Sequence, residues 1–395
     1  MNGFLVLFFV VLITLAAVFR ADFVLIFLYL LAGVYVISHW WGRRAIKAVV
    51  LSRELNERAF FGERVIVRIE ARNQGMLPVV WAYLRETLPM ELAPEGISQE
   101  VVSIGPKKKV KMEYTLDCLK RGYYAIGPMN MFSGDLLGLT KQQAVQFPAN
   151  HLTVFPKIIP LSKVVLPTQS PLGTLHYHQP LSADPARVRG KRDYIPGDSL
   201  HQVDWKASAA VRRLQIKLLE PSISLETMIF LNLNRAEFEI KDLYRASELG
   251  IIVAASVANW IIRARQAVGL CTNGIDLLTE VDYPVTLPPR RGLGHLLHLL
   301  EILARVQNEQ TFPLVSLIQQ EVVHLAWGTT LIVIANQVDD DLFEALLRAR
   351  RRGISAILIL CGYVERLLEI QHKAAFFKYP LVHFMTEKDL DIWRE

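Results

Sequence analysis

The feature that most constrains this chain is a pair of long apolar runs close to its start. Residues 3–19 are 17 consecutive positions without a charged side chain, residues 23–41 are another 19, and only Arg20, Ala21 and Asp22 separate them. As helices that rise 1.5 Å per residue, the runs would span roughly 25 and 28 Å. The hydrocarbon core of a bilayer is ~30 Å thick. The pattern therefore predicts a transmembrane helical hairpin over residues 1–44.

The residues that close the second run indicate its orientation. Aromatic side chains end the run and cations follow it directly: Tyr35, Trp40, Trp41, Arg43, Arg44 and Lys47. Because positive charge favours the cytoplasmic side, we expect the bulk of the chain in the cytoplasm. A cleavable signal peptide and a pair of buried or re-entrant helices are the alternatives. No Lys or Arg precedes the first run, and a signal peptide would leave the second run unexplained.

Residues 45–150 change to short runs in which apolar and polar side chains alternate. Residues 64–72, 79–85 and 109–117 are the clearest examples. Period two, with turn residues between the runs, is typical of antiparallel strands. We therefore predict a small β-sandwich over residues 45–150. The run of three lysines at 107–109 follows a Gly-Pro turn and is interpreted as a solvated tip, with contact to an anionic leaflet as the alternative.

Residues 221–395 alternate between strand-like and helix-like stretches. We predict strands at 225–232, 267–271, 330–335, 354–360 and 381–384, and helices at 243–265, 293–306, 339–352 and 365–373. Acidic residues at 339–341 would oppose the dipole of their helix, and the arginines before Gly353 would close it. Strand and helix in this order indicate a mostly parallel sheet with helices on both faces.

Residues 151–220 are interpreted as a connector. Six prolines lie between residues 151 and 188, and no sustained period accompanies them. His176 and His178 would share a face in an extended chain, which could place two imidazoles on one metal. The local sequence offers no third ligand, so we interpret both as ordinary loop histidines.

The end of this connector, residues 189–217, is the least generic part of the chain. It carries seven basic and three acidic side chains, so that +4 of the chain's formal +6 lies here. Pro196, Gly197 and Asp198 predict a tight turn. In a structural interpretation, ion pairs lock a loop over packed aromatic residues. In a functional one, the segment docks an acidic protein, lipid headgroups or nucleic acid.

The same segment resembles a bacterial protein family. Residues 192–198 (RDYIPGD), 203–209 (VDWKASA) and 214–217 (LQIK) are similar to the signature of the family catalogued as domain of unknown function 58, and 119–128 and 134–139 resemble further parts of it. The resemblance implies a membrane hairpin, a β-sandwich and a von Willebrand A-like domain, in an inner-membrane protein associated with a MoxR-type AAA+ ATPase. His201 and Ala210 stand where the family usually has Arg, so an anion contact is not carried over to them.

A metal site of the von Willebrand A-like kind would lie after the first strand of the α/β domain. Such domains carry Asp-x-Ser-x-Ser there, whereas residues 232–236 read Asn-Leu-Asn-Arg-Ala. Mg²⁺ prefers anionic oxygen ligands, and the amides of Asn232 and Asn234 beside Arg235 are a poor substitute. We therefore predict a degenerate metal site at Asn232 and Asn234, with no metal and no cofactor.

We expect a non-enzymatic, two-pass protein of the bacterial inner membrane that recruits partners, a MoxR-type AAA+ ATPase by resemblance. No GxxxxGK[ST], HExxH or GxSxG motif occurs. The predicted contact residues are Arg192, Asp193, Tyr194, Gly197, Asp198, Asp204, Trp205 and Lys206. With Arg192 and Lys206 both replaced by Glu, we expect binding to be lost and the fold kept.

Two alternatives remain from the sequence. One is a metal-dependent hydrolase that uses Asp198 and Asp204 with His176, His178 and His201. The other is a binder of nucleic acid or anionic lipid through residues 189–217, although we expect no nucleic-acid binding. The three cysteines have no CxxC spacing and are predicted to be reduced core residues: Cys118, Cys271 and Cys361.

Overall fold

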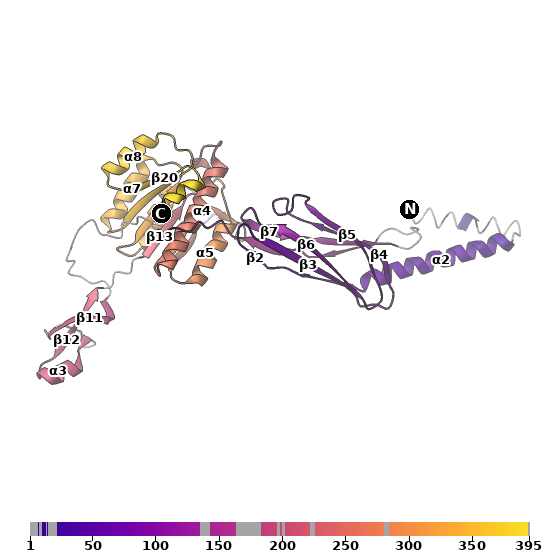
Figure 1. Cartoon of the computed structure of the whole chain (residues 1–395), viewed down its shortest axis with the longest axis horizontal. Coiled ribbons are helices and arrows are strands. Elements are labelled where there is room, and N and C mark those ends of the chain that lie inside the picture. The colour runs from indigo at the N-terminus through magenta and orange to yellow at the C-terminus, as the bar shows by residue number, and fades with distance from the viewer. Residues whose placement is uncertain are drawn as a thin grey trace. The chain divides into compact units, whose positions relative to one another are not determined.

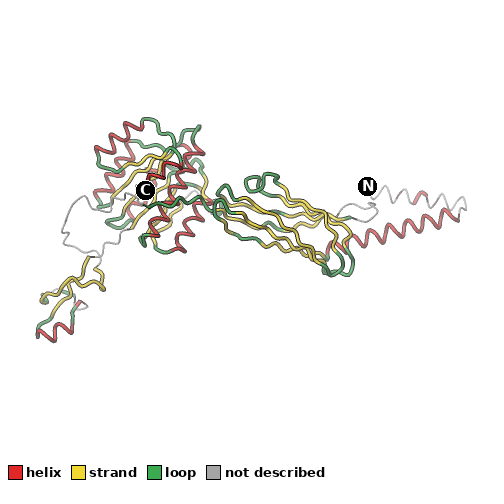
Figure 2. The backbone as a smooth tube through the Cα atoms, in the orientation of Figure 1, coloured by secondary structure: helices red, strands yellow, loops and turns green. Residues whose placement is uncertain are grey.

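The computed structural model describes residues 7, 10–12, 14, 22–134, 143–162, 183–195, 198–199, 202–221, 226–279 and 284–393. The chain forms two compact units, Met1–Lys157 with Leu300–Arg305, and Ile158–Leu299 with Val306–Glu395. Helix α2 and strands β1 to β10 belong to the first unit. The second unit holds a ribbon of two strands and a larger α/β domain (Figures 1 and 2).

Helix α2 spans Asp22–Lys47 and so continues three residues beyond the predicted boundary at 44. Most of the first apolar run lies outside the described residues. The helix is fixed to the sandwich near its end, where Trp41 Nε1 donates to the carbonyl oxygen of Pro78 (3.1 Å). The second predicted apolar run is thus one continuous helix in this structure.

The strands of the first unit form three sheets, in the orders β1-β3-β6, β2-β10-β7 and β5-β4-β8-β9. Their bounds are β1 Val49–Glu54, β2 Arg58–Ala59, β3 Arg64–Asn73, β4 Val79–Thr87, β5 Ile97–Ile104, β6 Lys109–Asp117, β7 Gly122–Ile126, β8 Met129–Ser133, β9 Gln143–Phe147 and β10 Asn150–Val154. The three strands predicted from alternation are therefore confirmed. Side chains from these sheets share one apolar core, in which Val67, Leu84 and Leu116 are fully buried.

A charged cluster lies inside this core. The Glu86 carboxylate is fully buried and forms an ion pair with Arg53, itself nearly buried. Tyr114 donates its hydroxyl to Glu86 Oε2 (2.7 Å), and Arg53 Nη1 donates to Asn150 Oδ1 (2.6 Å). Burial, together with the neighbouring carboxylate, raises the pKa of Tyr114 far above its ordinary value. A buried pair of this kind contributes most clearly when one partner is removed.

The predicted connector begins later than residue 151. Residues up to Val154 belong to β10, and the side chains of Phe155 and Ile159 are buried. The backbone N–H of Ile159 donates to Ser256 Oγ (2.9 Å). Pro156 follows the end of the strand, and within residues 155–162 the apolar side chains of Phe155 and Ile159 are still packed in a core. His176 and His178 lie outside the described residues.

The α/β domain is built on a six-stranded sheet in the order β16-β14-β13-β18-β19-β20. The strands are β13 Glu226–Leu231, β14 Ala267–Thr272, β16 Val285–Arg290, β18 Thr330–Ala335, β19 Ser355–Cys361 and β20 Leu381–Phe384, with a small pair β15 Ile275–Asp276 and β17 Val306–Gln307. The helices are α4 Leu243–Arg263, α5 Leu293–Arg305, α6 Leu314–Glu321, α7 Asp340–Arg351 and α8 Leu367–Phe376, with 3-10 turns η2 Arg235–Glu237, η3 Val322–His324 and η4 Glu387–Trp393.

The sheet is mixed. The sequence predicts its parallel strands but not the antiparallel strand at its edge. Strands β14, β13, β18, β19 and β20 pair parallel, whereas β16 adds antiparallel to β14 at the edge. Strand β16 and helix α6 were not predicted. Pro288 and Pro289 explain why β16 was missed, since a strand with prolines lacks N–H donors and is confined to a sheet edge.

Local signals placed the ends of α7 correctly. Asp339 caps the helix by accepting from the N–H of Leu342 (3.2 Å), and Gly353 follows it at φ +80°. A Cβ on Gly353 would lie 2.0 Å from Trp327 Nε1, so only glycine fits.

Helix α4 is largely buried in the α/β domain. Among the described residues, α4 is the helix whose length and composition would suit a membrane crossing, but 83% of its most apolar stretch is buried inside the protein.

The three cysteines are free and buried, as predicted. Burial raises the pKa of the Cys118 thiol to about 11 and that of Cys271 to about 12.

Candidate functional site

The signature segment folds as a ribbon with a short helix, not as a loose connector. Strand β11 (Ala183–Asp193) pairs antiparallel with β12 (Gln215–Pro221), and α3 (Trp205–Val211) lies between them in the chain (Figure 1). The register places Arg192 opposite Ile216 and Asp193 opposite Gln215. We call residues 183–221 the signature ribbon.

An ion pair closes the first turn of the signature ribbon. Arg192 donates from Nη1 to Asp198 Oδ2 (2.7 Å) and from Nη2 to Asp198 Oδ1 (2.6 Å). The backbone N–H of Ile195 donates to the same carboxylate (2.9 Å). The hydrogen bonds from Arg192 and Ile195 lower the pKa of Asp198, and the carboxylate in turn raises the pKa of Arg192. Two parallel charge-assisted bonds fix the turn geometry.

A second ion pair joins the strand to the start of α3. Asp204 caps the helix by accepting from the N–H of Ala207 (3.1 Å), and its other oxygen accepts from Lys191 Nζ (2.8 Å). These two bonds lower the pKa of Asp204, the one from Lys191 most. Ser208 completes the link, because its hydroxyl donates to the carbonyl of Asp204 (2.7 Å) and accepts from the N–H of Gln215 (2.8 Å).

The remaining predicted contact residues differ in their accessibility. Asp193 accepts a hydrogen bond from the Gln215 amide, and Tyr194 is half-buried with its N–H donated to Leu214 O (2.9 Å). In the structural interpretation of this segment Trp205 would pack beneath the ion pairs, but its side chain is 67% exposed. Lys206, next to it, is also exposed. Gly197 lies outside the described residues.

The signature ribbon therefore divides into an internal frame and an outer face. The internal frame consists of two ion pairs, Arg192 with Asp198 and Lys191 with Asp204. Because these charges are paired, they stabilise the shape of the ribbon. The outer face consists of exposed apolar and basic residues: Trp205, Lys206, Val211, Arg212, Arg213 and Leu214. Arg192→Glu would break the Asp198 pair, and the expectation that the double reversal with Lys206→Glu leaves the fold intact stays a prediction.

The hydrolase alternative lacks support in the described residues. Both of its carboxylates, Asp198 and Asp204, are engaged by cations and backbone N–H groups. Its three histidines, at 176, 178 and 201, lie outside the described residues. Within the described part of the chain, no three His, Cys, Asp or Glu side chains are grouped so that they could hold a metal.

The second place predicted from the sequence is the carboxyl end of β13. Asn232 and Asn234 are buried there, and both direct their amide groups to one carboxylate. Asn232 Nδ2 donates to Glu237 Oε2 (2.8 Å), and Asn234 Nδ2 donates to Glu237 Oε1 (3.2 Å). The N–H of Leu314, the first residue of α6, donates to Glu237 Oε1 as well (3.1 Å). Glu237 thus holds both amides and the start of α6.

The amide oxygens at this corner are also used. Asn232 Oδ1 accepts from Asn273 Nδ2 (2.9 Å) and from the N–H of Asn234 (3.1 Å). Asn234 Oδ1 accepts from the N–H groups of Ala236 (3.3 Å) and Thr311 (3.2 Å). The oxygens that a cation would need are therefore committed to internal donors, and the amide groups point at a fixed carboxylate.

A hollow of about 760 Å³ opens beside Glu237. It lies where the chain order reverses between β13 and β18, the position where sheets of this type bind ligands. Its charged lining consists of five acidic and two basic residues: Glu237, Asp339, Asp341, Glu344, Glu365, Arg348 and Arg366. Three of these acids have partners, since Glu237 accepts from the two asparagines, Asp339 caps α7 and Glu344 pairs with Arg348 (2.6 Å).

Glu237 is the residue that sequence reasoning missed. It is three positions beyond Asn234, so the sequence shows an acid near the degenerate site. The contact of its carboxylate with the start of α6, 77 residues later, gives no local signal.

Comparisons with known proteins agree on a family. Residues 190–360 match the family described as "Protein of unknown function DUF58". The "Uncharacterized protein YeaD" of Bacillus subtilis (strain 168) is 24% identical over 342 residues, which are 78% of this chain and 81% of that protein.

Solved structures give weak likenesses only. The CARDB domain of the PF1109 protein from Pyrococcus furiosus, solved with di-metal ions, has a TM-score of 0.20 at 14% identity and covers 27% of this chain and 86% of its own. Proximal thread matrix protein 1 from the mussel byssus has a TM-score of 0.32 at 8% identity, over 43% of this chain and 46% of its own. Scores this low carry no functional argument. The family match begins in the signature ribbon and runs through the sheet to β19, so residues 190–360 of this chain are similar to the DUF58 family.

Proposed function

We propose that this protein is a non-enzymatic, membrane-anchored factor that recruits a partner protein through the outer face of the signature ribbon. The main support for the proposal is that the ribbon combines an internal frame of ion pairs with exposed apolar and basic side chains. Its acidic side chains pair with Arg192, Lys191 and Arg213, while Trp205 and Lys206 remain at the surface. An exposed tryptophan beside cations is typical of a protein-binding hot spot. By family resemblance, the partner is a MoxR-type AAA+ ATPase.

Membrane anchoring is supported by the surface of α2. Phe23, Ile26, Leu30 and Ile37 are all exposed along this helix, which is unfavourable in water. The helix ends in aromatic and basic residues, as membrane-spanning helices do at the cytoplasmic interface. We propose a two-pass inner-membrane topology with the bulk of the chain in the cytoplasm. Protease added to intact cells should leave the α/β domain whole, and its digestion there would contradict this topology.

The α/β domain is proposed to be von Willebrand A-like and to act through its surface. Its central strand β13 lies between β14 and β18 in a mostly parallel sheet, which suits that assignment. At the position of the metal in such domains, Glu237 and the two asparagines satisfy each other. This internal pairing supports a domain without a catalytic metal.

The partner assignment is tested by co-purification from membranes. The variant Trp205→Ala with Lys206→Glu removes the largest apolar contact and reverses the charge beside it. We expect retention of the AAA+ ATPase to fall at least tenfold, because hot-spot truncations cost about 2 kcal/mol or more.

A matched control lies outside the residues that match the family. Ile392→Ala with Lys388→Glu changes an equally exposed apolar residue and lysine on η4. This control should retain the ATPase. Full retention by the Trp205 and Lys206 variant would refute the assigned contact face, and loss in both variants would show that the effect is not specific to the ribbon.

A further inference from the structure

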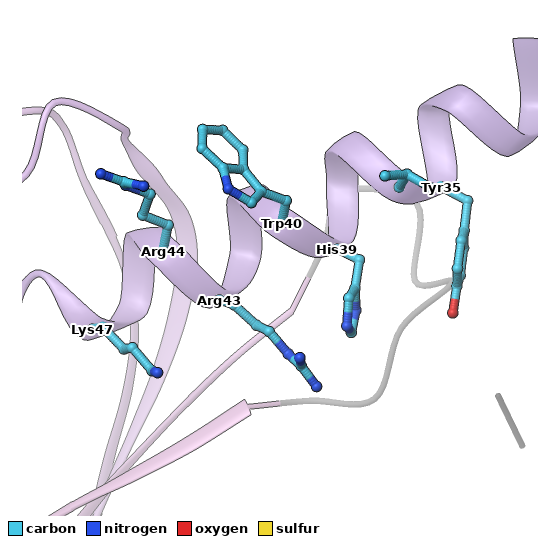
Figure 3. Close-up of a pocket in the computed structure, with 7 residues that line it drawn as sticks. Tyr35, His39, Trp40, Arg43, Arg44 and Lys47 are labelled. Atoms are coloured by element: carbon cyan, nitrogen blue, oxygen red, sulfur yellow. The ribbon is translucent and has the colours of Figure 1, made fainter.

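Two basic clusters lie in the first unit, at places far apart in the sequence. One closes α2 and contains Arg43, Arg44 and Lys47, which line a surface hollow of about 450 Å³ with aromatic neighbours. Figure 3 shows Trp40 and Arg44 on one side of the helix, and Tyr35, His39 and Arg43 on the other. The second cluster lines a hollow of about 440 Å³ at the turn between β5 and β6: Arg72, Lys107, Lys108 and Lys109.

Backbone hydrogen bonds bring the two clusters to the same end of the sandwich. The N–H of Gln74 donates to the carbonyl of Ala48 (2.9 Å), directly after Lys47. The N–H of Asn73 donates to the carbonyl of Lys108 (3.0 Å). A Cβ on Gly75 would lie 2.8 Å from the Cβ of Ala48, so the turn after β3 presses against the end of α2. The seven cations named above therefore form one group, which we call the basic collar.

The three lysines at 107–109 are exposed, as the prediction of a solvated tip requires, but their placement beside further cations is costly. The register of β3 and β6 holds Arg72 opposite Lys109, and like charges directly opposite each other destabilise a sheet. Glu70 offsets part of this, since it pairs with Lys109 (3.1 Å), and Lys107 Nζ donates to the carbonyl of Gln74 (2.7 Å). The group as a whole stays strongly positive.

An exposed apolar side chain stands among these cations. Met76 follows Gly75 in the turn after β3 and is 79% exposed. Lys107 lies beside the same turn, since its Nζ donates to the carbonyl of Gln74 and its N–H to that of Gly75. An apolar tip next to cations matches a bilayer interface, where the tip enters the acyl boundary and the cations meet lipid phosphates. Trp41 and Lys47 are six residues apart on α2, or roughly 9 Å, so the cations that end α2 lie within about one Debye length of the surface that α2 would enter.

We infer that the basic collar binds the anionic phospholipid headgroups of the leaflet that α2 enters, with Met76 inserted between them. This inference rests on the proposed membrane anchoring. Its consequence is that the sandwich docks on the membrane in a fixed orientation instead of tumbling on a tether.

The test uses the full-length chain in lipid nanodiscs, with an environment-sensitive fluorophore attached at Met76→Cys. The three native cysteines are buried, so the label is selective. Met90→Cys is the matched probe: Met90 is 77% exposed and lies near the other end of the sandwich, where the N–H of Asp117 donates to the carbonyl of Leu92. We expect the Met76→Cys label to shift to the blue in discs containing phosphatidylglycerol, but not in phosphatidylcholine discs. The Met90→Cys label should not respond.

Charge reversal separates lipid binding from apolar insertion. Each Lys or Arg near an anionic surface contributes about fivefold, so Arg72→Glu with Lys108→Glu should lower the ratio of inserted to withdrawn label by about 25-fold or more. Because Glu at position 72 would face Lys109, this variant should fold. The control reversal, Arg64→Glu with Lys120→Glu at the far end of the same strands, should change the ratio less than about twofold. About 1 M salt should abolish the shift.

The outcomes distinguish membrane anchoring by α2 from lipid binding by the basic collar. A chain that leaves both kinds of disc after detergent removal refutes the anchoring itself. A chain retained in both, with the same Met76→Cys emission in neutral and anionic discs, overturns the collar alone. A shift produced in neutral discs by excess inorganic phosphate would also overturn it, because the site would then bind free phosphate and not a lipid surface.

Discussion

Replacing Glu237 with Ala tests the central claim about the degenerate metal corner. In the native structure this carboxylate accepts from the buried amides of Asn232 and Asn234 and from the first N–H of α6. Pro313, which precedes α6, offers no side-chain cap. Glu237→Ala leaves two buried amide groups and one helix-end N–H without an acceptor.

The magnitude follows from the hydrogen bonds that the substitution removes. A buried donor left unsatisfied costs about 1–3 kcal/mol, and two of the three donors here are buried amides. Water entering the vacated space would recover part of that cost, so we expect a loss of about 2–4 kcal/mol. This corresponds to a fall of roughly 30- to 1,000-fold in hydrogen-exchange protection.

Hydrogen exchange of the full-length chain in detergent measures this loss in peptides from β13, β14 and β18. Glu239→Ala, two residues away and half-buried, is the control and should cost less than about 0.5 kcal/mol. An equal effect of both substitutions, or none from Glu237→Ala, would refute the reasoning. Added Mg²⁺ should leave the native protection unchanged, whereas a ligand at 100 times its Kd would add about 2.7 kcal/mol. A rise of that size would show that the corner still binds cations.

Three further predictions concern other parts of the chain. Arg53→Met should destabilise the sandwich by about 3–5 kcal/mol, because Glu86 stays buried without its partner. Adding Glu86→Leu should recover most of the lost stability. An unchanged denaturation midpoint in the single variant would argue against the buried pair. The lowered pKa of Asp198 means that its stabilising effect is present above the unfolded value of about 3.9 and is lost as pH falls through the lower folded value. Protection of the Ile195 amide should weaken over that range, and constant protection would count against the ion pair. The buried cysteines should resist maleimide at about pH 8 until denaturant is added, and rapid labelling of the native chain would contradict their placement.

Periodicity and end signals predicted most of the fold. Strict alternation located β3 and β6, apolar runs located β13, β18 and β19, and Asp339 with Gly353 located α7. These signals are local, because a residue's face and a helix end depend on neighbours within a few positions. Strand β16 could not be found in this way, since its prolines are typical of a loop and only pairing with β14 makes it a strand.

The candidate site was predictable only in part. The sequence alone determined that residues 189–217 are unusual in charge and that Asn232 and Asn234 lack the chemistry of a divalent-metal site. It did not determine that Arg192 and Asp198 satisfy each other while Trp205 faces outward.

Only the tertiary structure decided which distant side chains meet. Glu237 reaches the start of α6, and the end of α2 meets the turn after β3, which is itself hydrogen-bonded to the turn after β5. Such contacts are set by strand register and by which element packs on which, and neither is written in the period of a single stretch. The sequence by itself thus determined most of the elements and placed two neutral amides at Asn232 and Asn234, whereas packing decided that the Glu237 carboxylate binds both amides and that the basic collar gathers at one end of the sandwich.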